Sequence, residues 1–268
     1  MTDSGRFNVL GTLVNAVDLE AATAQVIAAA KEGRPLGVSA LAVHGVMCGV
    51  DDPAHQYRLN HLEMVVPDGQ PVRWALNWLH GAGLPERVYG PDLMHRVCER
   101  AAEEGLPVFL FGSAMDTLAS LEERLCQLHP RLQIAGSRPS RFRAVTPVEL
   151  EADLTMISES GARLVFVGLG APRQEIWTFE NGRLLSMPTL AVGAAFDYHA
   201  GNLRRPPGWM QRVGLEWLAR LVQEPRRLWR RYLILNPRYL FLLGLQLTGL
   251  RDFPIERARQ PAERVRPG

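Results

Sequence analysis

A glycine-rich stretch at residues 167–175, ValGlyLeuGlyAlaProArgGlnGlu, has the composition of a ligand-binding turn. Gly168 and Gly170 carry no side chains, so the backbone there can approach a ligand closely. The helix predicted to follow would offer free amides to a phosphate. The stretch is not a dinucleotide fingerprint, because Arg173 stands where the third glycine belongs and no acidic residue follows a strand at the required distance. Gln174 either faces the cleft or helps to cap the helix.

An aspartate follows the short apolar strand predicted at residues 64–66. Asp68 stands in the turn between Pro67 and Gly69, beyond the carboxyl end of that strand. A carboxylate in this place can act as a general base when the cleft holds its pKa suitably. The alternative is an aspartate that only stabilises the turn.

Two further loops carry polar side chains. Arg87 and Asp92 form a cluster near one loop, although Asp92 could equally cap the helix predicted at 92–104. His44 ends an apolar strand, where it contacts a ligand or hydrogen-bonds with the backbone, and the sequence favours neither.

Known metal and nucleotide motifs do not occur in the sequence. Asp197 and His199 follow a strand, but no second histidine lies at ligand spacing. There is no Asp-x-Asp pair, P-loop, nucleophile elbow or His-Glu-x-x-His motif. The sequence therefore predicts neither a metal nor a cofactor.

Strands and helices alternate between residues 7 and 193, which predicts a Rossmann-like α/β fold: a mostly parallel sheet with helices on both faces. The predicted strands are 7–11, 36–43, 64–66, 108–111, 164–167 and 190–192, and the predicted helices are 18–31, 70–80, 91–104, 116–128 and 147–161. Ligands of such sheets bind beyond the carboxyl ends of the strands. That rule selects the turns at 43–45, 67–69, 112–114, 168–175 and 193–197.

The charge of the chain is unevenly distributed. Its 268 residues have a formal net charge of +2, but residues 1–200 hold 16 basic and 23 acidic residues, whereas residues 201–268 hold 14 and 5. We therefore divide the chain into a Rossmann-like body, 1–200, and a basic, amphipathic helical C-terminal appendage, 201–268. Such an appendage would meet an anionic membrane, nucleic acid or phosphorylated substrate, or would be a solvated basic helix pair.

The appendage also has an apolar character. Residues 239–250 are uncharged but too few to span a bilayer, and arginines flank them. Pro225 is expected to start a new helix and Pro237 to interrupt it. With Trp229 nearby, this describes a helix that lies in a membrane interface, or one that packs on the body or on a partner subunit.

Composition excludes collagen, coiled-coil, disordered and secreted disulfide-rich proteins. Cys48, Cys98 and Cys126 are too few and too far apart for a disulfide framework, which favours a reducing, cytoplasmic setting. The first residues lack the basic start and apolar run of a signal peptide.

Together these stretches resemble the WecG/TagA/CpsF family of bacterial glycosyltransferases (glycosyltransferase family 26). The matching blocks are ValProAspGlyGlnProVal (66–72), LeuProGluArgValTyrGlyProAspLeuMet (84–94), ValPheLeuPheGlySer (108–113), the glycine-rich stretch (167–175), ValGlyAlaAlaPheAsp (192–197), AlaGlyAsnLeuArgArgProProGlyTrpMet (200–210) and GlyLeuGluTrpLeuAlaArgLeuValGlnGluProArgArg (214–227). Several independent blocks in the right order cover nearly the whole chain.

The resemblance implies transfer of a sugar from a UDP-sugar to a polyprenyl-diphosphate-linked acceptor in surface polysaccharide synthesis. Family members are considered inverting and metal-independent, and they act as peripheral proteins on the inner face of the cytoplasmic membrane. The implied partners are the donor, the acceptor and an anionic membrane surface that contacts residues 204–251, with no nucleic acid. Whether the chain forms a homo-oligomer stays open, as do the donor sugar and the pathway.

The resemblance also implies roles for individual residues. By position, Asp68 matches the proposed catalytic base, Arg87 a phosphate ligand, and Gln174 a residue near the nucleotide-sugar. The appendage arginines that would bind the leaving diphosphate are Arg220, Arg227 and Arg230.

Two positions depart from the family pattern, which has a Thr-x-Asn pair where this chain has Ala40 and Ala42. Ser39 and His44 are the nearest polar residues. His44 is a candidate to take over part of that role. A non-catalytic partner of a polysaccharide-synthesis complex and, less favoured, an NAD-dependent oxidoreductase remain alternatives.

Overall fold

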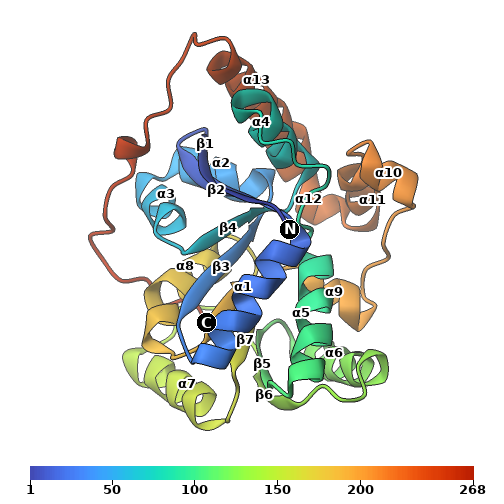
Figure 1. Ribbon diagram of the computed structural model, residues 1–268. Helices are drawn as coiled ribbons and strands as arrows, with labels where there is room; N and C mark the ends of the chain where they lie inside the picture. Colours follow the sequence, from blue (N-terminus) through green and yellow to red (C-terminus); the bar gives the residue numbers. More distant parts are fainter.

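The fold is built around a parallel sheet in a computed structural model that describes residues 1–268, except for the side chain of Arg212. Among the described residues the sheet has six strands in the order β4-β3-β8-β7-β5-β6 (Figure 1). They are β3 (Leu36–Leu41), β4 (Met64–Pro67), β5 (Val108–Gly112), β6 (Ile134–Arg138), β7 (Leu164–Gly168) and β8 (Pro188–Ala191). Every neighbouring pair is parallel, so the predicted α/β fold is confirmed.

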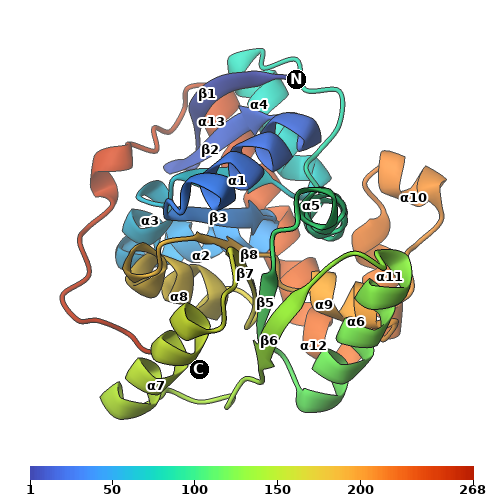
Figure 2. The same ribbon diagram turned by 60° about the horizontal axis from the view of Figure 1, so that its bottom comes forward.

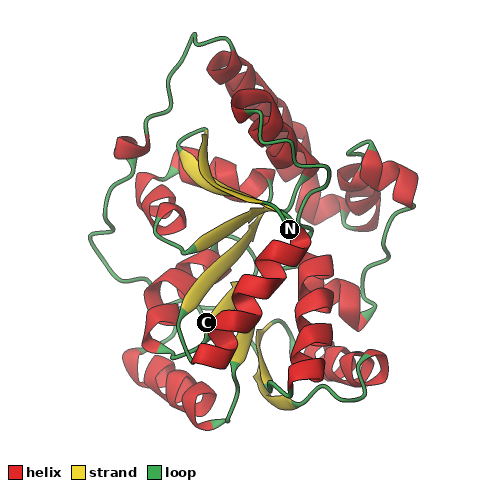
Figure 3. Cartoon of the chain, viewed as in Figure 1, coloured by secondary structure: helices red, strands yellow, loops and turns green.

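Side chains of each strand alternate between two faces, as the period of a β-strand requires. On β5, for example, Val108 and Leu110 join one core cluster, whereas Phe109 and Phe111 join another. The first cluster packs against α1 (Leu19–Glu32), α5 (Gly90–Glu104), α6 (Met115–Leu128) and α9 (Ala195–Ala200). The opposite face is covered by α2 (Val43–Asp51), α3 (Pro53–Asn60), α4 (Gln70–His80), α7 (Pro147–Glu159) and α8 (Arg173–Asn181) (Figure 3).

The N-terminal strand differs from the prediction. Residues 7–9 belong to an antiparallel hairpin of β1 (Asp3–Val9) and β2 (Thr12–Val17), outside the parallel sheet. Its turn at Leu10 and Gly11 has φ of 51° and 85°, and the Asn8 Oδ1 accepts the Gly11 amide at 2.7 Å. Such a two-residue turn with positive φ is typical of tight hairpins.

Helices α2, α3, α9 and α10 (Gly208–Arg212) and strands β2 and β6 were not predicted. The predicted strand 36–43 ends at Leu41, and α2 begins two residues later, followed directly by α3. His44 therefore lies in the first turn of α2 and not at the end of a strand. Strand β6 was also missed, because its residues are only partly buried and carry no apolar run.

The C-terminal segment consists of α10 (Gly208–Arg212), α11 (Glu216–Gln223), α12 (Pro225–Arg230), a π-helical turn η2 (Arg231–Leu235) and α13 (Asn236–Leu247). Pro225 begins a helix as predicted. Pro237 does not interrupt it: the chain stays helical from α12 to α13 through the π-helical turn. A wider turn there accommodates a proline that lacks an N–H and crowds the preceding carbonyl. No helix among the described residues is both long and apolar enough to cross a membrane.

One face of α13 docks on the body, beside α2 and α4 (Figure 1). Tyr239, Leu242 and Leu243 are buried there, and the Tyr239 hydroxyl donates to the Pro71 carbonyl at 3.1 Å. The other face leaves Leu240 exposed. The predicted division at residue 200 falls at the end of α9, and it stays a prediction.

Substitutions on the two faces of α13 should have different effects. Leu243 is 1% exposed and Leu240 is 51% exposed. We expect Leu243→Ala to lower the free energy of unfolding by about 2 to 5 kcal/mol, because it leaves a cavity in the core. The matched control Leu240→Ala should change it by less than about 0.5 kcal/mol. Urea unfolding followed by circular dichroism measures both, and equal effects would contradict the docking of α13.

Candidate active site

A cavity of about 930 Å³ lies at the carboxyl ends of the strands. Its lining residues include the segments that follow β3, β4, β5, β7 and β8, and α11, α12 and η2 supply the wall that belongs to the C-terminal segment. Figure 2 labels α11 and α12. This is the position at which parallel sheets bind their ligands. The C-terminal segment thus completes a site that the body alone would leave open.

All of the site residues predicted from the sequence line this one cavity. They are His44, Asp68, Arg87, Gly168, Gly170, Gln174, Arg220, Arg227 and Arg230. They come from five separate parts of the chain, and the fold brings them together without showing what they bind.

Asp68 is held by backbone hydrogen bonds to two other segments of the chain. Its own amide donates to the Leu41 carbonyl at 3.1 Å, and its Oδ1 accepts the Gly90 amide at 2.6 Å. Burial raises the pKa of Asp68 to about 6, although Arg87 and the Gly90 amide act in the opposite direction. The carboxyl group is therefore mostly ionised at neutral pH and remains basic enough to accept a proton.

Arg87 reaches the cavity from the loop before α5. Its Nη2 donates to the carboxylate of Glu216, the first residue of α11, and its guanidinium lies 4.2 Å from the centre of the Tyr89 ring. The Tyr89 hydroxyl donates to the same carboxylate. Glu216 lies in the sequence block 214–227, and the sequence alone predicted no role for it.

Arginines concentrate on the cavity wall that the C-terminal segment supplies. Arg220 and Arg227 pair with Glu224 at 3.1 and 2.8 Å. Arg230 and Arg231 have no ion pair among the described residues. These two uncompensated cations make the wall a favourable surface for an anionic ligand.

The glycine-rich turn is explained in part by packing. A Cβ on Gly168 would lie 2.6 Å from the Phe196 ring, so this glycine is required by the core, whereas Gly170 has φ of +76° and open space beside it. The backbone N–H of Gln174 already donates to the Gly170 carbonyl at 3.1 Å. Fewer backbone amides are therefore free to bind a phosphate than expected.

The side chains that follow this turn carry acceptors without partners. The Gln174 Nε2 donates to Glu175 Oε1 at 2.8 Å, whereas Gln174 Oε1 and Glu175 Oε2 have no hydrogen-bond partner among the described residues. Burial raises the pKa of Glu175. Both residues line the cavity, and their unpartnered oxygens are buried atoms.

His44 and the two alanines surround the end of β3. Burial, with Arg231 nearby, lowers the pKa of His44 to about 4, so its ring is neutral at pH 7. Ala40 and Ala42 line the cavity close to Asp68, where they present only methyl groups.

Asp92, Asp197 and His199 have other contacts. Asp92 lies in the first turn of α5 without capping it, and pairs with Arg205 at 2.6 Å. Asp197 lines the cavity, and the His199 Nε2 lies 2.8 Å from the Pro91 carbonyl oxygen. No group of three or more histidine, cysteine or acidic side chains that could hold a metal occurs in the described part of the chain.

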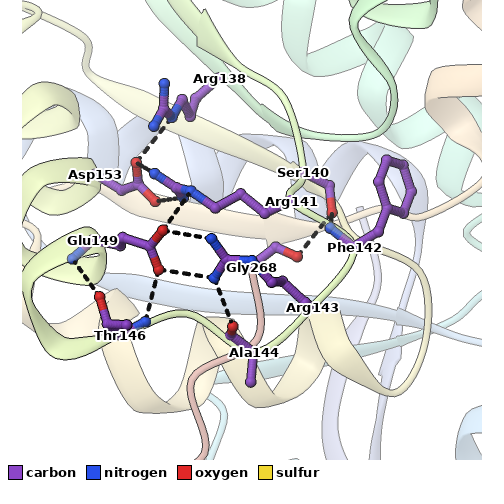
Figure 4. Close-up of polar contacts among 10 residues, drawn as sticks. All are labelled: Arg138, Ser140, Arg141, Phe142, Arg143, Ala144, Thr146, Glu149, Asp153 and Gly268. Carbon is purple, nitrogen blue, oxygen red and sulfur yellow. Dashed lines mark hydrogen bonds and ion pairs between the residues drawn. The ribbon is translucent and has the colours of Figure 1, made fainter.

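A loop that the sequence analysis missed forms one rim of the cavity. Phe142 lines the cavity with φ of 55°, and the Arg173 guanidinium lies 5.9 Å from its ring centre. Figure 4 shows how this loop is held: Arg138 and Arg141 both bind the buried Asp153, Arg143 binds Glu149, and the Ser140 hydroxyl donates to the Gly268 carbonyl at 2.8 Å. No single motif marks these contacts: the ion pairs join residues 6 to 15 positions apart, and Ser140 and Gly268 are 128 positions apart.

Comparison with known protein families gives a match over most of the chain. The model described as the Glycosyl transferase WecG/TagA/CpsF family matches residues 7–252 of the 268. The match includes the body and the helices α10–α13, and the resemblance predicted from the sequence blocks is confirmed.

Proposed function

Because the chain belongs to the WecG/TagA/CpsF family of glycosyl transferases, which supports a role in surface polysaccharide synthesis, we propose that its donor is a UDP-sugar. The acceptor in this proposal is a polyprenyl-diphosphate-linked glycan at the inner face of the cytoplasmic membrane. One observation carries the proposal: a single cavity brings the strand-end carboxylate of Asp68 together with Arg87 and a wall of arginines.

The proposed reaction is a single displacement. Asp68 takes the proton of the acceptor hydroxyl while that oxygen attacks the anomeric carbon. The bond from the anomeric carbon to the diphosphate oxygen breaks, and UDP leaves with the electron pair. One base and one displacement would invert the anomeric configuration.

Arginines supply the charge that the leaving group needs. Arg87 lies in the cavity on the side of the body, and Arg220, Arg227 and Arg230 lie on the opposite wall. Guanidinium groups bind diphosphate oxygens through paired hydrogen bonds and stabilise the charge that develops. This arrangement supports a metal-independent transfer.

The residues around Asp68 support the proposal that this chain recognises its sugar differently from family members that have the Thr-x-Asn pair. Ala40 and Ala42 offer no hydrogen bond, and neutral His44 is a nearby side chain that can donate or accept one. We assign His44 and Gln174 to contacts with the sugar or the nucleotide.

The exposed apolar side chains of the C-terminal segment support peripheral membrane contact by residues 204–251. They are Trp209, Val213, Leu218, Val222, Trp229, Leu233, Ile234, Leu240, Phe241, Leu247 and Leu250. Arginines interspersed among apolar residues are typical of helices that lie in an anionic membrane interface.

Asp68→Asn should abolish the base without removing the anion site. We expect kcat to fall by about 10²- to 10⁴-fold, because the amide cannot take the acceptor proton. UDP released from a panel of UDP-sugars with a lipid-diphosphate acceptor measures transfer, and calorimetry with UDP in magnesium or chelator measures binding.

Asp116→Asn is the matched control, since Asp116 is exposed in the first turn of α6 and outside the cavity. A fully active Asp68→Asn variant would refute the base assignment. A wild-type protein that binds UDP but transfers no sugar would favour the non-catalytic alternative.

The pH dependence should report the ionisation of Asp68. Only the carboxylate accepts a proton, and the pKa of Asp68 is about 6. We expect kcat/KM to level off about one pH unit above the pKa of about 6 and to fall below it, approaching a tenfold loss for each pH unit. A rate that is constant from pH 5 to 7.5 would contradict this role.

Membrane contact should depend on the exposed face of α13. Phe241→Asp is expected to reduce co-sedimentation with vesicles rich in phosphatidylglycerol, because it places a negative charge in the apolar face. Leu184→Asp, which alters an exposed leucine on the body, is the control. Binding by the wild type should weaken as salt rises. Equal binding by Phe241→Asp and wild type would exclude this face as the contact.

A further inference from the structure

Glu216 is an acidic residue in the most basic part of the chain, and it is only 7% exposed. It begins α11 on the wall of the cavity that would face an anionic diphosphate. A buried carboxylate there opposes an anionic ligand and loses hydration, so its contacts must compensate for both effects.

The compensating donors all come from the body. Arg87 and Tyr89 donate from the loop before α5, and the Tyr198 hydroxyl on α9 lies 3.5 Å from Glu216 Oε1. Tyr89 and Tyr198 also pack edge to face, with ring centres 5.9 Å apart. Glu216 is therefore the polar contact by which the first helix of the wall is joined to the opposite side of the cavity.

Two cavity arginines depend on this contact for their place. Arg87 is held between the Glu216 carboxylate and the face of the Tyr89 ring. Arg220 lies one turn after Glu216 on the same helix, with its guanidinium 5.7 Å from the centre of the Tyr198 ring. Fixing Glu216 thus orients one arginine from each side of the cavity.

We propose that Glu216 is a positioning residue that docks α11 on the body and holds Arg87 and Arg220 in the arrangement that receives the donor diphosphate. The part that concerns the diphosphate rests on the proposed function, whereas the docking of α11 does not. The competing role is an internal anion that occupies Arg87 until the donor displaces it. Three donors on one buried carboxylate favour positioning, because displacement would leave Glu216 buried without partners.

Glu216 also affects the pKa of Asp68, the proposed base. Arg87, Arg220 and the Gly90 amide lower the pKa of Asp68, and Glu216 raises it. Removing the charge of Glu216 should therefore move the acid limb of the pH-rate profile to lower pH. A residue with only a structural role would reduce the rate without moving that limb.

The experiment compares Glu216→Gln with Glu256→Gln, a control at an exposed acid of the C-terminal segment. We expect Glu216→Gln to speed hydrogen exchange of residues 214–224, to raise the Kd for UDP about tenfold or more, and to lower the pH of the acid limb. Glu216→Asp should restore the acid limb in part. In an Arg87→Ala background, Glu216→Gln should weaken UDP binding by a smaller factor than in the wild type, because only its effect through α11 and Arg220 remains.

Three results would overturn the proposal: unchanged exchange at 214–224, tighter UDP binding by Glu216→Gln, or additive effects of the Arg87 and Glu216 variants. Tighter binding would establish the internal-anion role instead. A wild-type protein that does not bind UDP would refute the proposed donor. The exchange measurement needs no ligand, so it would still decide whether Glu216 docks α11.

Discussion

Several like charges must share one wall of the cavity, and the rest of the site is built around that constraint. Arg220, Arg227 and Arg230 lie within two neighbouring helices, and like charges repel most strongly where protein replaces water, as it does around Arg220, whose side chain is 12% exposed. Glu224 compensates two of them, and the apolar docking of α13 fixes the helical path that carries the third. An anionic ligand would relieve the repulsion that remains, so the wall combines stability with a preference for anions.

Much of the body could be predicted because its signals are local. Apolar runs bounded by glycine or proline predicted five of the strands in the parallel sheet, and a capping box of Thr146 and Glu149 begins the helix predicted at 147–161. The rule for parallel sheets then placed the strand-end residues at one edge, and the structure gathers them in one cavity. The roles of the appendage arginines were predicted only from their match to family positions, because their spacing alone does not indicate a diphosphate site.

Other features depend on contacts between distant residues, which a local pattern does not contain. The helix α2 begins at Val43 without a capping side chain. The apolar run at 36–43 was therefore predicted as one strand, and no sequence signal marked the start of the helix. The π-helical turn before Pro237 contacts α2, and the Phe142 rim is tied to Gly268 through Ser140. Glu216 had a weak signal, as one of five acidic residues among the last 68, but only the structure shows which donors it meets.

In the proposed reaction, the site has to reconcile two opposing demands on charge. Arginines that stabilise a departing diphosphate also lower the pKa of a nearby carboxylate, and a weaker base takes a proton from an acceptor hydroxyl less readily. Around Asp68, burial and Glu216 raise the pKa, whereas Arg87 and Arg220 lower it, and the result is about 6. A site with the arginines alone would bind the leaving group and impair the base. A buried acid that pairs with Arg87 and raises the pKa of Asp68 lessens that conflict, and so an acidic residue is useful in a wall that is otherwise basic.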